Sequence, residues 1–305
     1  MAMPADNLVH HLSFDVEEFF QVEGAARCVD RGDWASFASR LDEPVGRILD
    51  LLAERAVRAT FFVLGWVARQ RGELVRRIAA AGHEVASHGM SHHMLARLGA
   101  ETFRRELRDS RQILQDLCGQ EIVGFRAPTF SITHETSWAL DVLIEEGWQY
   151  DSSVFPVRHD RYGVPDAPTG PHWARAGRLR RTPPVASGEG RILELPPLTR
   201  RVLGGNWPVG GGGYLRLLPL WVLKGALAAA QRRGQPAMIY LHPWELDPDQ
   251  PVLKMGRVGT WRHRVNLRHT HDKLRRLLTA FRFTCVRDSL PALRAADWPS
   301  WTYGQ

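Results

Sequence analysis

Two histidines and two carboxylates have types and spacings that could bind a metal ion and activate water. His88 and His92 are four residues apart in SHGMSHH, so a helical turn or a tight loop could direct both imidazoles at one ion. Asp15 and Glu17 lie in SFDVEEFF, and alternate residues of an extended chain project to the same side. One carboxylate could bind the ion while the other takes a proton from water. Taken separately, each segment favours the simpler explanation, which is a chance histidine pair in one case and a solvated acidic turn in the other.

Three further polar residues follow apolar segments. Arg126 in GFRAPTF could hold a carboxylate in place, and Pro128 stiffens the turn after it. Asp151 in YDSS ends a short strand-like segment, and His242 follows the apolar run MIYL. A single histidine at such a position is more often structural than catalytic.

Four aromatic residues near these motifs could stack on a sugar ring or equally well pack in the core. They are Phe130, Trp207, Tyr214 and Trp244. Tyr214 follows four glycines in NWPVGGGGY, residues 206–214, which predicts a flexible loop with Tyr214 as a lid.

The segments that must position these residues alternate between strand-like and helical patterns. We expect strands at 8–14, 59–64, 83–87, 122–125, 192–195, 237–241 and 282–286, with a short strand ending at 151. We expect helices at 43–55, 72–81, 101–117, 136–146, 217–233 and 270–281. This alternation predicts an α/β fold, an irregular (β/α) barrel of seven parallel strands with a C-terminal extension. In such barrels the chemistry gathers at the C-terminal ends of the strands, where the polar residues fall.

The domain organisation follows from the absence of internal repeats and low-complexity linkers. We expect one domain over 1–305, with a core at about 8–245 and 270–290. The stretches at about 157–190 and 247–268 lack periodicity and are rich in arginine, which predicts long surface insertions.

The composition narrows the classes of partner. The 305 residues are 44% hydrophobic and carry a formal charge of +7. Arginine prefers carboxylates and phosphates, so an acidic glycan, a lipid diphosphate or a membrane surface could bind, besides a simply solvated basic surface. No nucleic-acid-binding motif is present, so nucleic acid is not expected as a partner.

The cysteines and the hydropathy predict a cytoplasmic protein. The three cysteines (Cys28, Cys118 and Cys285) are far apart and form no CxxC pair, which fits a reducing compartment. The sequence shows neither an apolar run of about 18 residues nor a secretory signal.

The order of the five motifs resembles the polysaccharide deacetylase family, the NodB-like enzymes of carbohydrate esterase family 4. The resemblance spans roughly 8–245 and keeps the motifs in order. The flanking segments FDVEEFFQV, VRHDRYGVP and YLHPWELDPDQP are similar to a subgroup associated with exosortase and exopolysaccharide loci.

The resemblance implies a role for each motif residue. The implied roles are metal ligands (His88 and His92), general base (Asp15), arginine that orients the base (Arg126), general acid (His242) and carboxylate that tunes the acid (Asp151). It also implies substrate contacts near Pro128 and the four aromatic residues.

One position departs from the family pattern. The second aspartate of the common T-F-D-D-G motif is the third metal ligand, and here that position is Val16, which cannot bind metal. We expect Glu17 to replace it, with Glu18 as the second choice. Two histidines and a carboxylate suit Zn²⁺ best, although Co²⁺, Ni²⁺ or Fe²⁺ could bind.

The resemblance predicts a metal-dependent hydrolase that removes N-acetyl groups from an amino-sugar polysaccharide or a lipid-linked oligosaccharide during exopolysaccharide biosynthesis. Such an enzyme could associate peripherally with membrane-bound glycan assembly machinery. One alternative is another amide hydrolase on the same scaffold, such as a sugar-lipid deformylase or a ureide hydrolase. The other is a glycan-binding protein with a degenerate site, which the Val16 departure motivates.

Overall fold

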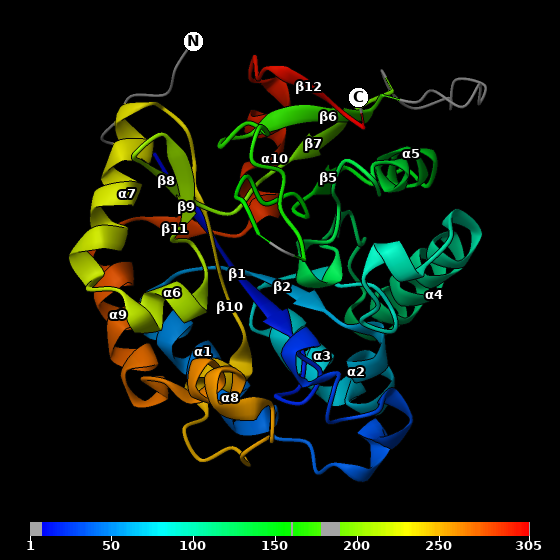
Figure 1. The fold of residues 1–305 in the computed structure, drawn as a ribbon, viewed down its shortest axis with the longest axis vertical. Helices are drawn as coiled ribbons and strands as arrows, with labels where there is room; N and C mark the ends of the chain where they lie inside the picture. Colours follow the sequence, from blue (N-terminus) through cyan, green and yellow to red (C-terminus); the bar gives the residue numbers. More distant parts are fainter. Residues whose placement is uncertain (1–7, 160, 178–189, 305) are drawn as a thin grey trace.

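The protein has an α/β fold in which a large, mostly parallel sheet is surrounded by helices (Figure 1). The computed structural model describes residues 8–159, 161–177 and 190–304. The sheet order is β10-β1-β2-β3-β4-β5-β7-β6-β12, and β11 pairs with β1. The first seven strands of this order pair in parallel, as the sequence predicts.

The strands of this sheet are short. They are β1 (His10–Val16), β2 (Thr60–Val63), β3 (Glu84–Ser87), β4 (Gly124–Phe125), β5 (Tyr150–Asp151), β6 (His172–Ala176), β7 (Ile192–Glu194), β10 (Met238–Leu241), β11 (Phe283–Thr284) and β12 (Ser300–Tyr303). A parallel bridge between Pro197 and Met238 joins the segment after β7 to β10, at the other end of the parallel run.

Helices follow most of the parallel strands. They are α1 (Asp42–Glu54), α2 (Gly65–Gln70), α3 (Gly72–Ala80), α4 (Ala100–Cys118), α5 (Trp138–Glu145), α6 (Gly212–Leu217), α7 (Leu220–Arg232), α8 (Gly256–Arg264), α9 (Thr270–Ala280) and α10 (Val286–Ala295). None of the helices in the described part of the chain is both long enough and apolar enough to cross a membrane.

The alternation of side chains along β1 explains how this strand serves both the core and the site. Leu12, Phe14 and Val16 belong to the main hydrophobic core, and the Phe14 ring stacks on Phe61 of β2 with centroids 5.1 Å apart. Residues between them must project to the other face of the sheet, because the side-chain period of a strand is two. Asp15 therefore projects from the face of the sheet opposite to this hydrophobic core.

The parallel strands place their C-terminal ends on one side of the sheet. Figure 1 shows β1 and β10 side by side, with their arrowheads at the same end. Asp15 lies near the end of β1, His88 directly follows β3, Arg126 follows β4 and His242 follows β10. The chain thus brings residues more than 200 positions apart to one edge of the sheet.

The segment at 157–190 contains a core strand, so the prediction of a surface insertion is wrong for its middle part. Strand β6 pairs antiparallel with β7 and parallel with the C-terminal β12. His172 is buried, and its Nε2 lies 2.5 Å from the hydroxyl of Tyr303. The five-residue strand HWARA is too short to show a clear period. Residues 160 and 178–189 lie outside the described residues.

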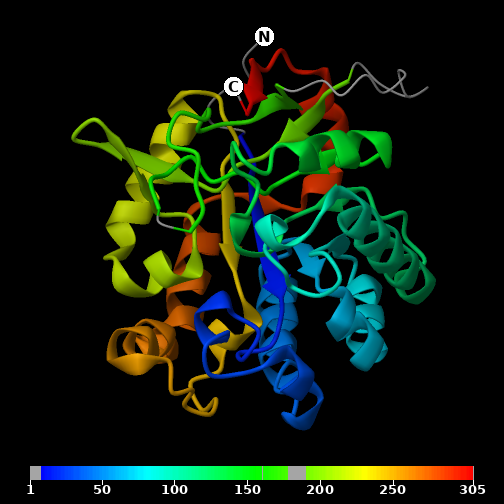
Figure 2. The same ribbon diagram turned by 45° about the vertical axis from the view of Figure 1, so that its right-hand side comes forward.

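Three more segments contain more helix or strand than the sequence predicts, namely 247–268, 206–214 and the C-terminal extension. The 247–268 stretch contains α8, and the predicted flexible loop at 206–214 contributes to β9 (Gly205–Pro208) and to α6. β9 pairs with β8 (Thr199–Val202) as a separate hairpin, which projects from the body of the protein in Figure 2. Helix α10 and strand β12 add to the expected C-terminal extension.

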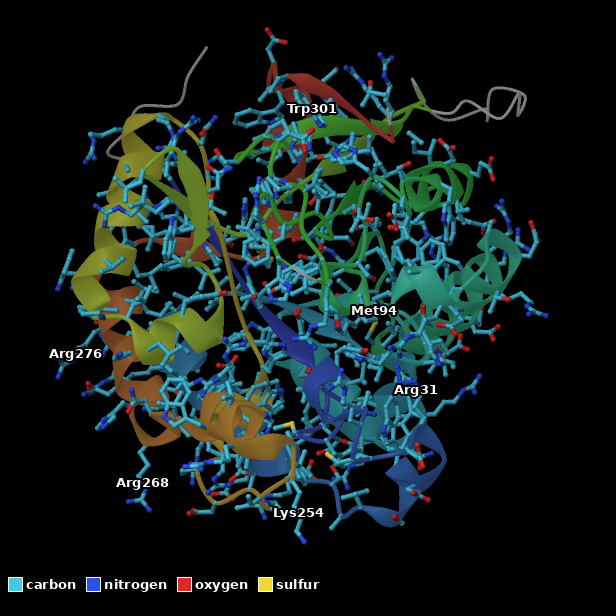
Figure 3. The ribbon with its side chains drawn as sticks, in the orientation of Figure 1. Arg31, Met94, Lys254, Arg268, Arg276 and Trp301 are labelled. Carbon is cyan, nitrogen blue, oxygen red and sulfur yellow. The ribbon has the colours of Figure 1, made fainter. Side chains whose placement is uncertain are left out.

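The surface carries many arginines that point to solvent. Figure 3 shows Arg268, Arg276 and Lys254 directed outward from the body of the protein. Arg276 pairs with Asp272 one helical turn away, whereas Arg268 is exposed and forms no ion pair within the described residues. All three cysteines are free, in agreement with the sequence analysis.

Candidate metal centre and active site

Glu17, His88 and His92 form a buried cluster of three potential metal ligands. One ligand atom from each residue can be chosen so that all three lie within 4.8 Å of one another. An oxygen of Glu17, Oε2, lies 2.5 Å from Nε2 of His92 and 3.9 Å from Nε2 of His88. A carboxylate and two imidazoles are the donors that zinc binds.

A tight turn brings the two histidines together. His88 directly follows β3, and both Gly89 (φ 73°) and His92 (φ 55°) adopt the left-handed conformation. This conformation is uncommon for residues other than glycine. The Nδ1–H of His88 donates to the carbonyl oxygen of Arg126 at 2.8 Å, which leaves Nε2 directed into the cluster. His93 contacts Arg31 instead and takes no part in the cluster.

The protonation states of the cluster suit a bound cation. Burial lowers the pKa of His88 to about 4, so this imidazole is neutral at pH 7 and can act as a ligand. Burial alone would raise the pKa of Glu17, but the imidazoles of His92 and His242 outweigh it and lower the pKa to about 2. Glu17 Oε2 has no hydrogen-bond partner within the described ranges. An ionised, buried oxygen that faces two imidazole nitrogens is the kind of group that a cation stabilises, so the residues fit a divalent metal.

The neighbours of Glu17 in the sequence lie elsewhere. The side chain of Val16 is fully buried in the hydrophobic core, on the opposite face of β1. Glu18 accepts a hydrogen bond from the backbone N–H of Arg40 at 3.1 Å and is not among the clustered ligands. Strand alternation thus brings Glu17, rather than Glu18, to the histidines.

Asp15 is held by a fully buried arginine beside this cluster. Nη1 of Arg126 donates to Asp15 Oδ1 at 2.6 Å and to Ser13 Oγ at 2.8 Å. Nε and Nη2 of Arg126 donate to the carbonyl and the hydroxyl of Ser152. The guanidinium lies over the ring of Phe62, 4.1 Å from its centroid. Each of the three nitrogens of this guanidinium donates a hydrogen bond, so the Asp15 carboxylate has a fixed place.

His242 lies across the site from the histidine cluster and faces both carboxylates. Its Nε2 is 3.7 Å from Glu17 Oε1 and 3.9 Å from Asp15 Oδ2. Burial disfavours the charged imidazolium, but the carboxylates of Glu17 and Glu245 outweigh burial and raise the pKa of His242 to about 9. His242 is therefore protonated at neutral pH and can donate a proton.

The carboxylate hydrogen-bonded to Nδ1 of His242 is that of Glu245, whereas the sequence analysis expected Asp151 to tune this histidine. Glu245 Oε1 accepts from Nδ1 of His242 at 2.9 Å, and its other oxygen accepts from Nε of Arg216 at 2.8 Å. The sequence carried a signal for this pair. His242 caps a short 3₁₀ helix, Pro243–Leu246, and a glutamate three residues after a cap is typical of a capping box.

Asp151 supports a different part of the site. Its carboxylate accepts a short hydrogen bond from the hydroxyl of Ser153, which itself accepts from the backbone N–H of Ala127 at 2.7 Å. Burial raises the pKa of Asp151 to about 6, and the adjacent buried Glu194 has a pKa well above its usual range. Asp151 therefore braces the segment that follows Arg126 and forms no ion pair with His242.

The four glycines before Tyr214 allow close packing against the acid pair. A Cβ at Gly212 would lie 2.1 Å from Oε1 of Glu245, and one at Gly211 would lie 2.5 Å from the hydroxyl of Tyr240. Any larger residue at either position would displace the side chains around His242. The run thus permits close contact at the site, whereas the sequence suggested a flexible loop.

A pocket of about 290 Å³ joins these groups and contains three of the predicted substrate contacts. Its lining includes Asp15, Glu17, His88, His92 and His242, together with Phe130, Tyr214 and Trp244. Trp244 is mostly buried, stacks against His242 and His263, and donates its N–H to Glu17 at 3.4 Å. These contacts give Trp244 a positioning role toward the acid and the metal ligand.

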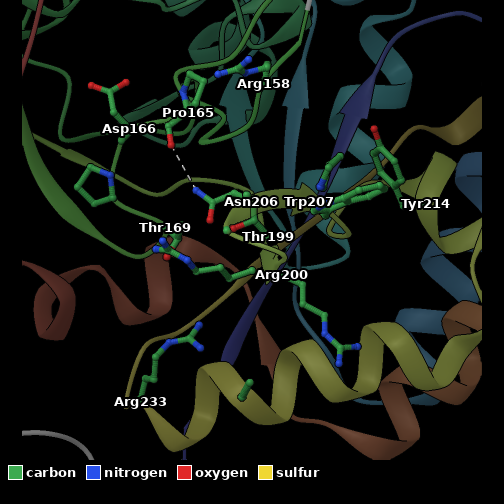
Figure 4. Close-up of a pocket in the computed structure, with 17 residues that line it drawn as sticks. Arg158, Pro165, Asp166, Thr169, Thr199, Arg200, Asn206, Trp207, Tyr214 and Arg233 are labelled. Carbon is green, nitrogen blue, oxygen red and sulfur yellow. Dashed lines mark hydrogen bonds between the residues drawn. The ribbon is translucent and has the colours of Figure 1, made fainter.

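The other two predicted contacts lie outside this pocket. Pro128 is buried and lies close to Gly89, where a Cβ would be 3.7 Å from its Cδ. Trp207 is 59% exposed on β9 and lines a second, larger pocket, which Tyr214 also borders (Figure 4).

Comparison with known proteins shows that part of the chain is similar to polysaccharide deacetylases. Residues 28–143 match the family model described as polysaccharide deacetylase, and residues 152–291 match a domain of unknown function, DUF3473. A chitooligosaccharide deacetylase of Rhizobium leguminosarum bv. trifolii is 41% identical over 98 residues, which are 32% of this chain and 43% of that protein. A peptidoglycan-N-acetylglucosamine deacetylase of Bacillus cereus is 34% identical over 96 residues, 31% of this chain and 35% of that protein. The chain thus spans less than half the length of these curated relatives.

The fold also has a solved counterpart. A crystal structure of a Mycobacterium smegmatis protein assigned to the polysaccharide deacetylases aligns with a TM-score of 0.60 at 20% identity. The alignment covers 94% of this chain and 90% of that one. The similarity at this identity extends to the fold.

Replacing Glu17 tests the composition of the metal centre. Losing a residue that only contacts a metal ligand typically weakens metal binding about 10–100-fold. We expect Glu17→Gln to weaken Zn²⁺ binding by more than this, because the substitution removes a charged ligand. Glu18→Gln is the matched control and should bind Zn²⁺ as the unmodified protein does. Isothermal titration calorimetry measures both affinities, and equal losses in the two variants would argue against Glu17 as the ligand.

Replacing Glu245 tests the acid pair through the pH dependence of turnover. Protonated His242 is present below its pKa and is lost as the pH rises through it, so activity should fall on the alkaline side. Glu245→Gln removes a charge that raises the pKa of His242, and the alkaline limb of the kcat/KM profile should move to lower pH. An unchanged limb would show that Glu245 does not tune the proton donor.

Proposed function

We propose that this chain hydrolyses N-acetyl groups of an amino-sugar glycan. Its residues 28–143 match the family model of the polysaccharide deacetylases. The observation that carries the proposal is a pocket in which a base, an acid and a set of metal ligands converge from different strands. Asp15 with its arginine and His242 with its glutamate border the Glu17, His88 and His92 cluster. This arrangement suits the hydrolysis of an amide.

The proposed metal ligands are Glu17, His88 and His92, and Zn²⁺ suits them best. A divalent cation held there would polarise the acetyl carbonyl and make a bound water more acidic. The cluster is buried at the base of the pocket, so the substrate's acetyl group must enter the pocket to meet it.

Asp15 is the proposed general base. Arg126 balances its charge and fixes its orientation through the 2.6 Å ion pair. One oxygen of Asp15 is taken by the arginine, and the other, Oδ2, faces the pocket, where it lies 3.9 Å from His242. This second oxygen is the one available to accept a proton from water.

His242 is the proposed general acid. Its Nδ1 is bound to Glu245, so Nε2 is the nitrogen that can donate a proton to the departing amine. Glu245 is in turn held by Arg216, which keeps the glutamate ionised and in place. Base and acid thus have separate partners of opposite charge, the condition under which two titratable groups in one pocket keep different roles.

Several finer assignments rest on the sequence resemblance and remain predictions. These are a role in exopolysaccharide biosynthesis, a lipid-linked substrate, association with membrane-bound assembly machinery and a cytoplasmic location. A glycan-binding protein with a degenerate site is less well supported, because Glu17 stands beside the two histidines where Val16 could not. A pure binding role would also have no use for an acid and a base.

Acetate release tests the proposed function directly. The purified full chain should release acetate from N-acetylglucosamine oligomers, lose this activity on chelation, and regain it with added Zn²⁺ or Co²⁺. Asp15→Asn should lower kcat by about 10²–10⁴-fold, the contribution typical of a positioned general base, while Zn²⁺ binding persists. The proposal fails if no acetate appears with either metal, or if Asp15→Asn retains full activity. Formylated and cyclic amides then test the other amide hydrolases.

A further inference from the structure

A second cavity of about 1220 Å³ adjoins the catalytic pocket. Tyr214 lines both spaces, so the two meet at the start of α6. The walls of the second cavity come from the β8–β9 hairpin, the end of α7, Arg158 and residues 165–169 (Figure 4). Its volume exceeds the about 300–1,000 Å³ of pockets for drug-sized ligands, so it has room for a ligand longer than one sugar.

The cavity is lined by four arginines, Arg158, Arg200, Arg201 and Arg233. Figure 4 shows Arg200 and Arg233 on one side of the space and Arg158 on the other. Within the described ranges, the guanidinium groups of Arg158, Arg200 and Arg201 form no hydrogen bond or ion pair, and Arg233 donates to the neutral amide of Gln235.

Among the described residues of the lining, Asp166 is the only acid, and one carboxylate cannot balance four arginines. Asp166 pairs with the imidazole of His134, with Oδ1 3.0 Å from Nε2. A fifth arginine, Arg161, lines the catalytic pocket itself. The lining of the catalytic pocket also contains the carboxylates of Asp15, Glu17, Glu23 and Glu245, so the excess of arginine is confined to the second cavity and its border with that pocket. Guanidinium groups recognise carboxylate and phosphate oxygens through paired hydrogen bonds, so this lining suits an anion.

An exposed aromatic side chain accompanies the arginines. Trp207 is 59% exposed on β9, although large apolar side chains of this kind are usually buried. Its ring gives the cavity a flat apolar surface, and Trp207 is paired with Arg200 across the hairpin, while Arg201 is paired with Asn206. A ligand with both apolar ring faces and negative substituents, such as an acidic sugar chain, would contact both kinds of group.

We propose that this cavity binds a stretch of glycan carrying carboxylate or phosphate groups, next to the sugar whose acetyl group enters the catalytic pocket. The preferred substrate is then an acidic N-acetylated glycan. This inference rests on the proposed function for the position of the acetylated sugar, but the binding of the anionic stretch does not depend on turnover.

Binding measurements with matched oligosaccharides test the inference. Hyaluronan oligosaccharides carry a carboxylate on every second sugar, and chitin oligomers of equal length are neutral. We expect the unmodified protein to bind the hyaluronan oligosaccharide at least about tenfold more tightly, with the difference falling as salt rises, because salt screens exposed charges. UDP-N-acetylglucosamine provides the phosphate arm and shows whether a diphosphate is preferred to a carboxylate.

The paired substitution Arg200→Gln with Arg201→Gln should remove the preference for the acidic ligands and leave chitin-oligomer binding and turnover unchanged. Arg268→Gln removes an outward-pointing arginine far from the cavity lining and should change nothing. The inference is overturned if acidic and neutral ligands bind equally, or if Arg268→Gln has the same effect as the paired substitution. It is also overturned if the two arginines govern binding to phosphatidylglycerol vesicles but not to either acidic ligand.

The two proposals fail separately in these experiments. If the protein releases no acetate but binds the acidic ligand through Arg200 and Arg201, the result contradicts the proposed function alone. Release of acetate from chitin oligomers without any preference for acidic ligands would contradict the inference alone.

Discussion

The buried ion pair between Asp15 and Arg126 fixes the geometry on which the site depends. It joins the first strand of the sheet to the loop after the fourth, and the same guanidinium also binds Ser13 and Ser152. Removing one partner of such a pair leaves an uncompensated buried charge and typically costs about 3–5 kcal/mol. The pair therefore couples the position of the base to the integrity of the sheet. The carbonyl of Arg126 extends this coupling to the metal centre, because it accepts the Nδ1–H of His88.

The acid is positioned by a second set of contacts around β10, the strand that neighbours β1 on the side away from β2. Glu245 binds both His242 and Arg216, and the glycines before Tyr214 allow α6 to pack directly against this glutamate. The base, Asp15, is thus held by Arg126. The acid, His242, is held by Glu245, which Arg216 holds in turn. Glu17 lies between them, close enough to the acid to raise the pKa of His242 and to the histidines to complete a ligand set.

Sequence patterns predicted the α/β class, the parallel strands and the meeting of the polar strand ends, because each of these follows from local periodicity and strand direction. Alternation along β1 also placed Asp15 and Glu17 on one face. Other features depend on contacts between distant segments and were missed or misread. Strand β6 is too short to show a period, and the four glycines indicate close packing only once Glu245 is seen against them. The pairing of His242 with Glu245 was missed although a capping-box spacing marks it, because the sequence analysis named only Asp151 as the partner of this histidine.

The central claim is that Glu17, His88 and His92 hold one divalent metal ion between the base and the acid. Anomalous diffraction from crystals of the Zn²⁺-loaded protein tests it most directly. The account predicts a single strong peak about 2.0–2.2 Å from a ring nitrogen of each histidine and from a Glu17 oxygen. A peak coordinated without Glu17, or a fully loaded protein whose metal lies outside this pocket, would contradict it.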